Sequence, residues 1–137
     1  RQGAAEALAW LRLDNATKGD VLFLYDTRET DPEPEPEWVR RRLYEWGERR
    51  MALYLTHQQA MGRDVEVVRD TLAGVMARGE CVSLKDLAVN GSDLIELGIA
   101  PGPAVGEVLE RLMDIALADP GMNTKEKLTR ILQDQLL

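Results

Sequence analysis

Apolar side chains recur at helical spacing along most of the chain, and this periodicity predicts an all-helical protein. From Ala4 to Leu11 they fall three or four residues apart, as one face of an α-helix requires. A second apolar segment, Val21 to Tyr25, has a composition that also suits a strand. We predict helix there, because an isolated strand would leave its backbone hydrogen-bonding groups without a partner. Residues 1–30 are therefore expected to form a helical segment.

Residues 31–37 read Asp-Pro-Glu-Pro-Glu-Pro-Glu, and the alternating prolines exclude both a helix interior and a central strand. We expect an extended acidic linker at this place. Its carboxylates are poor candidates for a metal site, because a polyproline-like backbone spreads successive side chains apart.

The longest periodic stretch predicts a helix from Glu37 to about Arg63, and a second helix follows from Val65 to a stop at Gly79. Because a short turn joins them, they are expected to pack as an antiparallel hairpin over residues 38–79. Gly47 lies inside the first helix. Its missing side chain either weakens that helix by roughly 1 kcal/mol relative to Ala or lets a neighbouring helix approach closely.

Several helix-start signals occur close together in residues 80–137. These residues are predicted to form a small helical tail domain. The signals are capping patterns at Ser83–Asp86, at Asn90–Asp93 and at Asn123 with Glu126, and a proline, Pro103, suited to a first helical position. For the whole chain the pattern predicts an all-α helical bundle of six to eight helices without a substantial sheet.

Composition narrows the classes of function. The 137 residues carry 17 basic and 24 acidic side chains, and the resulting charge of −7 disfavours a protein that coats nucleic acid non-specifically. No apolar run reaches the length of a membrane span. The single cysteine, Cys81, fits a reducing compartment and disfavours zinc-binding families, so we expect a cytoplasmic location. Because the chain begins with Arg1 and shows no secretory signal, we expect it to be a piece of a longer polypeptide.

Three linked motifs carry further information: DLAVNGSDLIELGI at residues 86–99, PGPAVGEVL at 101–109 and NTKEKL at 123–128. In this order and spacing they resemble the C-terminal region of bacterial CCA-adding tRNA nucleotidyltransferases, in the family that includes poly(A) polymerases. Residues 1–78 resemble the helical body of that family in general character. Ser92 stands where the family often places a basic residue.

The resemblance implies that this chain is a body-and-tail fragment that holds the elbow of tRNA while a distant head extends the 3′ end. It implies that the parent protein needs Mg²⁺ and nucleoside triphosphates. No catalytic residue, metal site or cofactor is expected in the fragment, because nothing in it resembles the paired aspartates of the family's head.

Candidate RNA-binding residues fall into three groups. The first is the helix start after Pro103, where backbone amides without intrahelical partners point toward an anion. The others are an arginine stripe on the long helix and the lysines opening the last helix. The candidates are Gly102, Ala104, Val105, Gly106, Arg40, Arg41, Arg49, Lys125 and Lys127.

Each group also has a structural explanation. The glycines serve equally to permit a tight turn and close helix packing, and the arginines serve as a solvated face with Arg41–Glu45 and Glu45–Arg49 pairs. His57 is expected to be structural or solvent-facing, and Cys81 to be a buried thiol. The tryptophans are expected in the core rather than on a base-stacking surface.

Two other classes of function are open to this sequence. A helical protein-interaction or oligomerisation module, including self-association, would fit the acidic charge and the apolar positions on several helices. An independent small enzyme is disfavoured, because no paired acids or nucleophile and base occur at a suitable spacing.

Overall fold

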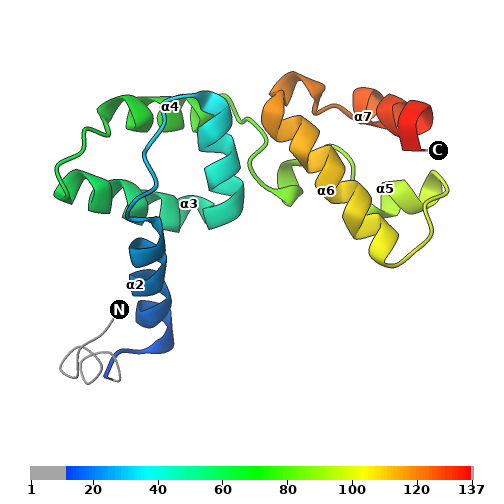
Figure 1. Ribbon diagram of the computed structural model, residues 1–137. Coiled ribbons are helices and arrows are strands. Elements are labelled where there is room, and N and C mark those ends of the chain that lie inside the picture. The colour runs from blue at the N-terminus through cyan, green and yellow to red at the C-terminus, as the bar shows by residue number, and fades with distance from the viewer. Residues whose placement is uncertain (1–11, 137) are drawn as a thin grey trace.

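The computed structural model describes residues 12–136, and within them the chain is helical without a strand (Figure 1). The α-helices are α2 (Asn15–Thr27), α3 (Pro36–Ala60), α4 (Glu66–Ala77), α5 (Gly91–Glu96), α6 (Pro103–Ala118) and α7 (Lys125–Ile131). Three short helical turns, Leu84–Asp86, Pro120–Met122 and Leu132–Leu136, complete the order. The all-α prediction is thereby confirmed, whereas the periodic segment Ala4–Leu11 lies outside the described residues.

The acidic linker ends two residues earlier than predicted. Residues 30–35 have neither helix nor strand, but Pro36 is the first residue of α3 and Glu37 lies in its first turn. A proline suits this position, since its fixed φ is helical and the N–H that it lacks would have no partner there.

The first core joins α2, α3 and α4. Its buried apolar residues are Phe23, Val39, Leu43, Met51, Tyr54, Leu55, Val65, Val68 and Val75. In Figure 1 the second part of α3 and α4 run side by side in opposite directions, as the periodicity predicts.

Gly47 divides α3 into two segments. Its backbone angles, φ 81° and ψ 166°, are not helical, and Figure 1 shows α3 as two segments that run in different directions. Neither sequence-based expectation for Gly47 was right. The helix is broken rather than weakened, and a Cβ at this position would meet no neighbour within 4 Å, so no helix approaches closely.

The second core joins α5, α6, α7 and the turns between them. Its buried residues are Cys81, Leu87, Val89, Leu94, Leu112, Met113, Ala116, Leu117, Leu128 and Leu132. The predicted start of α5 is confirmed as a capping box, because the Asn90 side chain accepts from the Asp93 amide and the Asp93 carboxylate accepts from the Asn90 amide, both at 3.0 Å.

Two other capping patterns mark helix starts in the structure, but the hydrogen bonds predicted for them were wrong. The Asp86 carboxylate accepts from the Val82 amide and the Ser83 hydroxyl, so that Ser83–Asp86 closes a single 3₁₀ turn instead of a capping box. Thr124, not Asn123, caps α7. Asn123 instead accepts from the Ala88 amide at 2.8 Å and donates to the Asp86 carbonyl at 2.9 Å, which fastens two loops of the second core together.

Candidate nucleic-acid interface

The start of α6 is exposed and has no side-chain cap. Gly102 precedes the helix with φ 119°, a conformation that favours glycine, and Pro103 follows as the first helical residue, as predicted. Ala104 and Gly106 are exposed, whereas Val105 is half-buried against the second core. A Cβ at Gly106 would meet no neighbouring side chain within 4 Å. The backbone at this helix start is therefore open to a ligand.

Fewer amides are free than the sequence predicted. The Val105 N–H donates to the Gly102 carbonyl at 3.1 Å, so it is not available to a ligand. Pro103 has no N–H, and within residues 12–136 the Ala104 N–H has no acceptor. The free Ala104 amide at the positive end of the α6 dipole is thus a feature that could attract an anion.

Helix α5 connects this helix start to a cation of α7. A Cβ on Gly91, at the beginning of α5, would lie 3.3 Å from Cγ1 of Val105, so the two helix starts are in close contact. On the same short helix the Asp93 carboxylate accepts from Lys125 Nζ at 3.3 Å. The pKa of Asp93 lies below its ordinary value, because the hydrogen bond from the Asn90 amide, helped by the weaker interactions with Lys125, outweighs the opposing effect of burial. Lys125 is two-thirds exposed, so its ammonium also remains accessible.

Arg111 is a candidate cation that the sequence analysis did not select. With Pro103, Gly106, Glu107 and Glu110 it lines a shallow depression on α6. The sequence contains a signal that could have identified Arg111, since residues 104, 107 and 111 recur at three- and four-residue spacing and so share a helix face. The two glutamates make the charge of this depression mixed rather than basic.

Lys127, the second predicted lysine, points toward a different place. Its ammonium donates to the Gly121 carbonyl at 2.9 Å, in the turn that joins α6 to α7. The structure therefore brings Lys125, but not Lys127, into contact with the helix that packs on the α6 start.

The predicted arginine stripe is not continuous, because Gly47 separates its two halves. Arg41, in the first half, donates to Glu37 at 2.9 Å and to Asp114 of α6 at 2.6 Å. Arg49, in the second half, forms a two-pronged pair with Asp20 of α2 at 2.7 and 3.0 Å. These partners differ from the predicted Arg41–Glu45 and Glu45–Arg49 pairs, although Arg49 is still two-thirds exposed.

Arg40 lies in the interior, where RNA does not reach it. The residue is 5% exposed, and its guanidinium donates to the carbonyls of Leu117 and Ala118 and to the Glu80 carboxylate. Sequence reasoning placed it on the surface because nothing local shows that α6, 77 residues further on, packs against it.

The cysteine, serine, histidine and tryptophan residues considered in the sequence analysis lie in the following environments. Cys81 is buried as predicted, and burial raises the pKa of its thiol. Ser83 donates to Asp86, and half-buried His57 has an Nδ1 atom without a partner among the described residues. Trp38 and Trp46 are half-buried and pack with Phe23 and Tyr54 against the first core, as expected of tryptophans in inter-helix packing. Trp10 lies outside the described residues.

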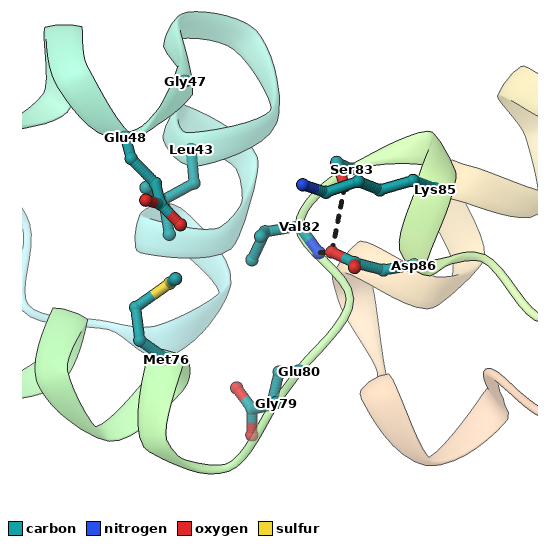
Figure 2. Close-up of a pocket in the computed structure, with 10 residues that line it drawn as sticks. All are labelled: Leu43, Gly47, Glu48, Met76, Gly79, Glu80, Val82, Ser83, Lys85 and Asp86. Atoms are coloured by element: carbon teal, nitrogen blue, oxygen red, sulfur yellow. Dashed lines mark hydrogen bonds between the residues drawn. The ribbon is translucent and has the colours of Figure 1, made fainter.

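A cavity of about 470 Å³ lies where the two cores meet (Figure 2). Leu43, Met76 and Val82 give it apolar walls, and Glu48 and Lys85 add charged side chains to its lining. Its mixed lining does not indicate one ligand class.

Among residues 12–136, no three His, Cys, Asp or Glu side chains gather in a way that could hold a metal ion. No described helix is long and apolar enough to cross a membrane.

These features define a class of protein: an all-helical unit with two small apolar cores and an exposed helix start that has no side-chain cap. The chain belongs to the family of tRNA nucleotidyltransferase domain 2, whose sequence model matches residues 1–132. The resemblance inferred from the three motifs is confirmed by this match.

Two curated relatives are CCA-adding enzymes of lactic acid bacteria. The enzyme of Lacticaseibacillus paracasei is 33% identical over 98 residues, which cover 69% of this chain and 24% of the relative. That of Limosilactobacillus fermentum is 39% identical over 69 residues, covering 44% of this chain and 17% of the relative. The chain thus spans less than a quarter of either relative. No solved structure matches it.

Proposed function

We propose that this chain binds the elbow of tRNA and positions it for nucleotide addition at the 3′ end by a catalytic unit outside these 137 residues. The observation that carries the proposal is the family match over residues 1–132, together with relatives named as CCA-adding enzymes. Mg²⁺ and nucleoside triphosphates would act at the catalytic unit, and the cytoplasm is the compartment in which we expect this work.

The start of α6 is the contact that the geometry supports best. Its Ala104 amide is free, its two glycines leave the backbone accessible, and Lys125 and Arg111 supply nearby positive charge. Arg41 and Arg49 are partly neutralised by acidic partners, so we assign them a secondary part. Arg40 is omitted because it is buried.

Recognition by shape suits this surface better than recognition by charge. The whole chain carries −7, and two glutamates line the depression beside Gly106. Proteins recognise folded RNA through its shape and its backbone, to which a few placed cations and amides suffice.

The test is fluorescence anisotropy of the chain with labelled tRNA and with a minihelix that lacks the elbow, at low and at moderate salt. We expect a preference for tRNA that survives moderate salt, because purely electrostatic binding weakens steeply as salt is added. Equal affinity for the two RNAs would contradict elbow recognition. An absence of binding together with a sedimentation mass that rises with concentration would favour the protein-interaction module.

The site itself is tested by Gly106→Glu. The matched control is Ala73→Glu, at an exposed position of α4, since both variants make the chain more acidic by one charge. Gly106→Glu is expected to weaken tRNA binding about tenfold, which equals about 1.4 kcal/mol. The control should change it less than about twofold. Equal effects of the two variants, with folding retained by circular dichroism, would show that the start of α6 does not contact the tRNA.

A further inference from the structure

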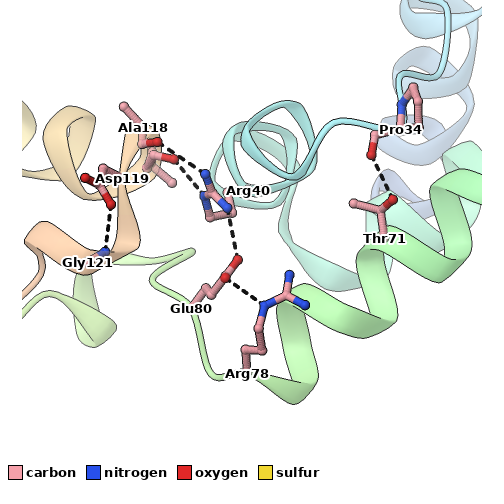
Figure 3. A network of polar contacts seen from close by, with 9 residues as sticks. Pro34, Arg40, Thr71, Arg78, Glu80, Ala118, Asp119 and Gly121 are labelled. Atoms are coloured by element: carbon pink, nitrogen blue, oxygen red, sulfur yellow. Dashed lines mark hydrogen bonds and ion pairs between the residues drawn. The ribbon is translucent and has the colours of Figure 1, made fainter.

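Arg40 joins three separate segments through one guanidinium (Figure 3). From α3, its Nε donates to the Leu117 carbonyl at 2.7 Å and its Nη2 to the Ala118 carbonyl at 3.3 Å. Its Nη1 donates to the Glu80 carboxylate at 3.0 Å. Both carbonyls belong to the last turn of α6, where carbonyl groups have no intrahelical partner. Arg40 therefore caps the C-terminal end of α6, where a cation is also favoured by the helix dipole.

Glu80 completes the junction between the two cores. It lies three residues after the end of α4, and its carboxylate accepts from Arg78 at 2.9 Å as well as from Arg40. Burial raises the pKa of Glu80, but the hydrogen bonds from Arg78 and Arg40 outweigh burial and hold it below its ordinary value. The carboxylate is therefore ionised at neutral pH and keeps the Arg40 guanidinium in place.

Two weaker contacts lie beside this junction along the same pair of helices. Tyr44 donates to Glu110 at 2.5 Å and Arg41 to Asp114 at 2.6 Å, so that α3 and α6 run in opposite directions past each other. Both contacts are exposed, and exposed pairs contribute little to holding a geometry. The Arg40 side chain is 6% exposed, which makes it the polar contact between these helices that solvent does not weaken.

We propose that Arg40 is a positioning residue, which fixes the direction of α6 and so sets where the start of α6 meets the RNA. This inference rests on the proposed function. The 16 residues of α6 span about 24 Å, so a tilt of about 10° at the end held by Arg40 displaces the other end by about 4 Å. A displacement of that size separates a backbone amide from a phosphate oxygen, because a hydrogen bond requires about 3 Å.

The test compares Arg40→Met and Arg40→Lys with Arg69→Met, a matched control on α4 whose guanidinium makes one 3.3 Å contact with Gln59. Lysine keeps the charge but not the planar fork that reaches several acceptors at once. Spin labels at cysteines replacing exposed Val67 on α4 and Ile95 on α5 report the distance between the cores, with Cys81 replaced by alanine in every protein. We expect a narrow distance distribution for the unaltered chain and the control, and a broader one for both Arg40 variants.

The second readout is the ratio of tRNA affinity to minihelix affinity. We expect both Arg40 variants to lower this ratio about tenfold while their minihelix affinity changes less than about twofold. A role limited to stability would leave the ratio unchanged among the folded molecules. If Arg40→Met does not fold, Arg40→Lys alone decides.

The outcomes separate the two proposals. If the unaltered chain shows no preference for tRNA, the proposed function fails and this inference fails with it. If the unaltered chain prefers tRNA and the Arg40 variants keep the full preference, the positioning role of Arg40 alone is overturned, whatever the distance distribution shows.

Discussion

Tyr54 shows how burial changes the chemistry of a single residue. The side chain has no exposed surface, and its hydroxyl donates to the Thr30 carbonyl at 2.5 Å. Burial raises the pKa of its phenol to about 12. Tyr44 has the same raised pKa, about 12, because burial and the hydrogen bond to Glu110 both disfavour the phenolate.

These two shifts predict a loss of stability in alkali. The folded-state pKa is higher than the ordinary value of 10, so the stabilisation is complete below pH 10 and is lost as the pH rises toward 12. We expect the free energy of unfolding in urea, followed by circular dichroism, to fall over this range. In Tyr54→Phe the fall should be smaller, and an equal fall in that variant would contradict the assignment.

At the scale of elements, the break in α3 depends on one backbone conformation. Gly47 adopts φ 81° and ψ 166°, a combination that residues with a side chain avoid. Because nothing lies within 4 Å of a Cβ at this position, any cost of a substitution comes from the backbone and not from a clash.

We predict that Gly47→Ala lowers the free energy of unfolding by about 1–3 kcal/mol. The same substitution at Gly106, whose φ is not positive, should raise it by up to about 1 kcal/mol, because alanine is the better helix former. Urea unfolding of the two variants measures both signs. A stable Gly47→Ala protein with increased helix content would show that α3 can be continuous.

The helices themselves follow from local patterns, and these were predictable. The apolar period placed α3 and α4, Pro103 marked the start of α6 and the Asn90–Asp93 pattern located the start of α5, because such signals act within a few residues. Asn123 and Gly47 were misjudged for the opposite reason. The partners of Asn123 lie more than 30 residues away, and the bend at Gly47 comes from a backbone conformation that the helical period on both sides of it does not reveal.

The candidate site was predictable to a smaller extent than the fold. The exposed start of α6 could be anticipated, since Pro103 and the flanking glycines mark it directly. The burial and the partners of each arginine could not be anticipated, because Arg40 is buried by a helix far along the chain and Arg49 is paired with a residue of another helix. A sequence shows how many cationic side chains a protein has, whereas only the packed structure shows which of them remain accessible.

At the scale of the whole molecule, acid pH is expected to act on several elements together. Asp14 and Asp93 cap α2 and α5, Asp20 pairs with Arg49, and Glu80 lies at the junction of the cores. The pKa of each of these carboxyl groups is below its ordinary value. In all four, hydrogen bonds to amides, hydroxyls or guanidinium groups outweigh the effect of burial.

Because these folded-state pKa values are lowered, the stabilisation is present above the ordinary carboxyl values of 3.8 to 4.5 and is lost as the pH falls below them. We predict a free energy of unfolding that declines from pH 5 toward pH 3, measured by urea unfolding at each pH. Glu80→Gln should show a shallower decline. A stability that does not change over this range would contradict the four assignments.

The aromatic residues are distributed unequally between the two cores, so the cores differ in their intrinsic fluorescence. Phe23, Trp38, Trp46 and Tyr54 are gathered in the first core, while residues 79–137 contain no Phe, Trp or Tyr. Emission from Trp38 and Trp46 therefore reports the first core, whereas Tyr44 is the aromatic residue among residues 12–136 that packs against the second core. An RNA that docks only on α6 would leave tryptophan emission unchanged, so a single tryptophan introduced near α6 would supply a signal that belongs to that end alone.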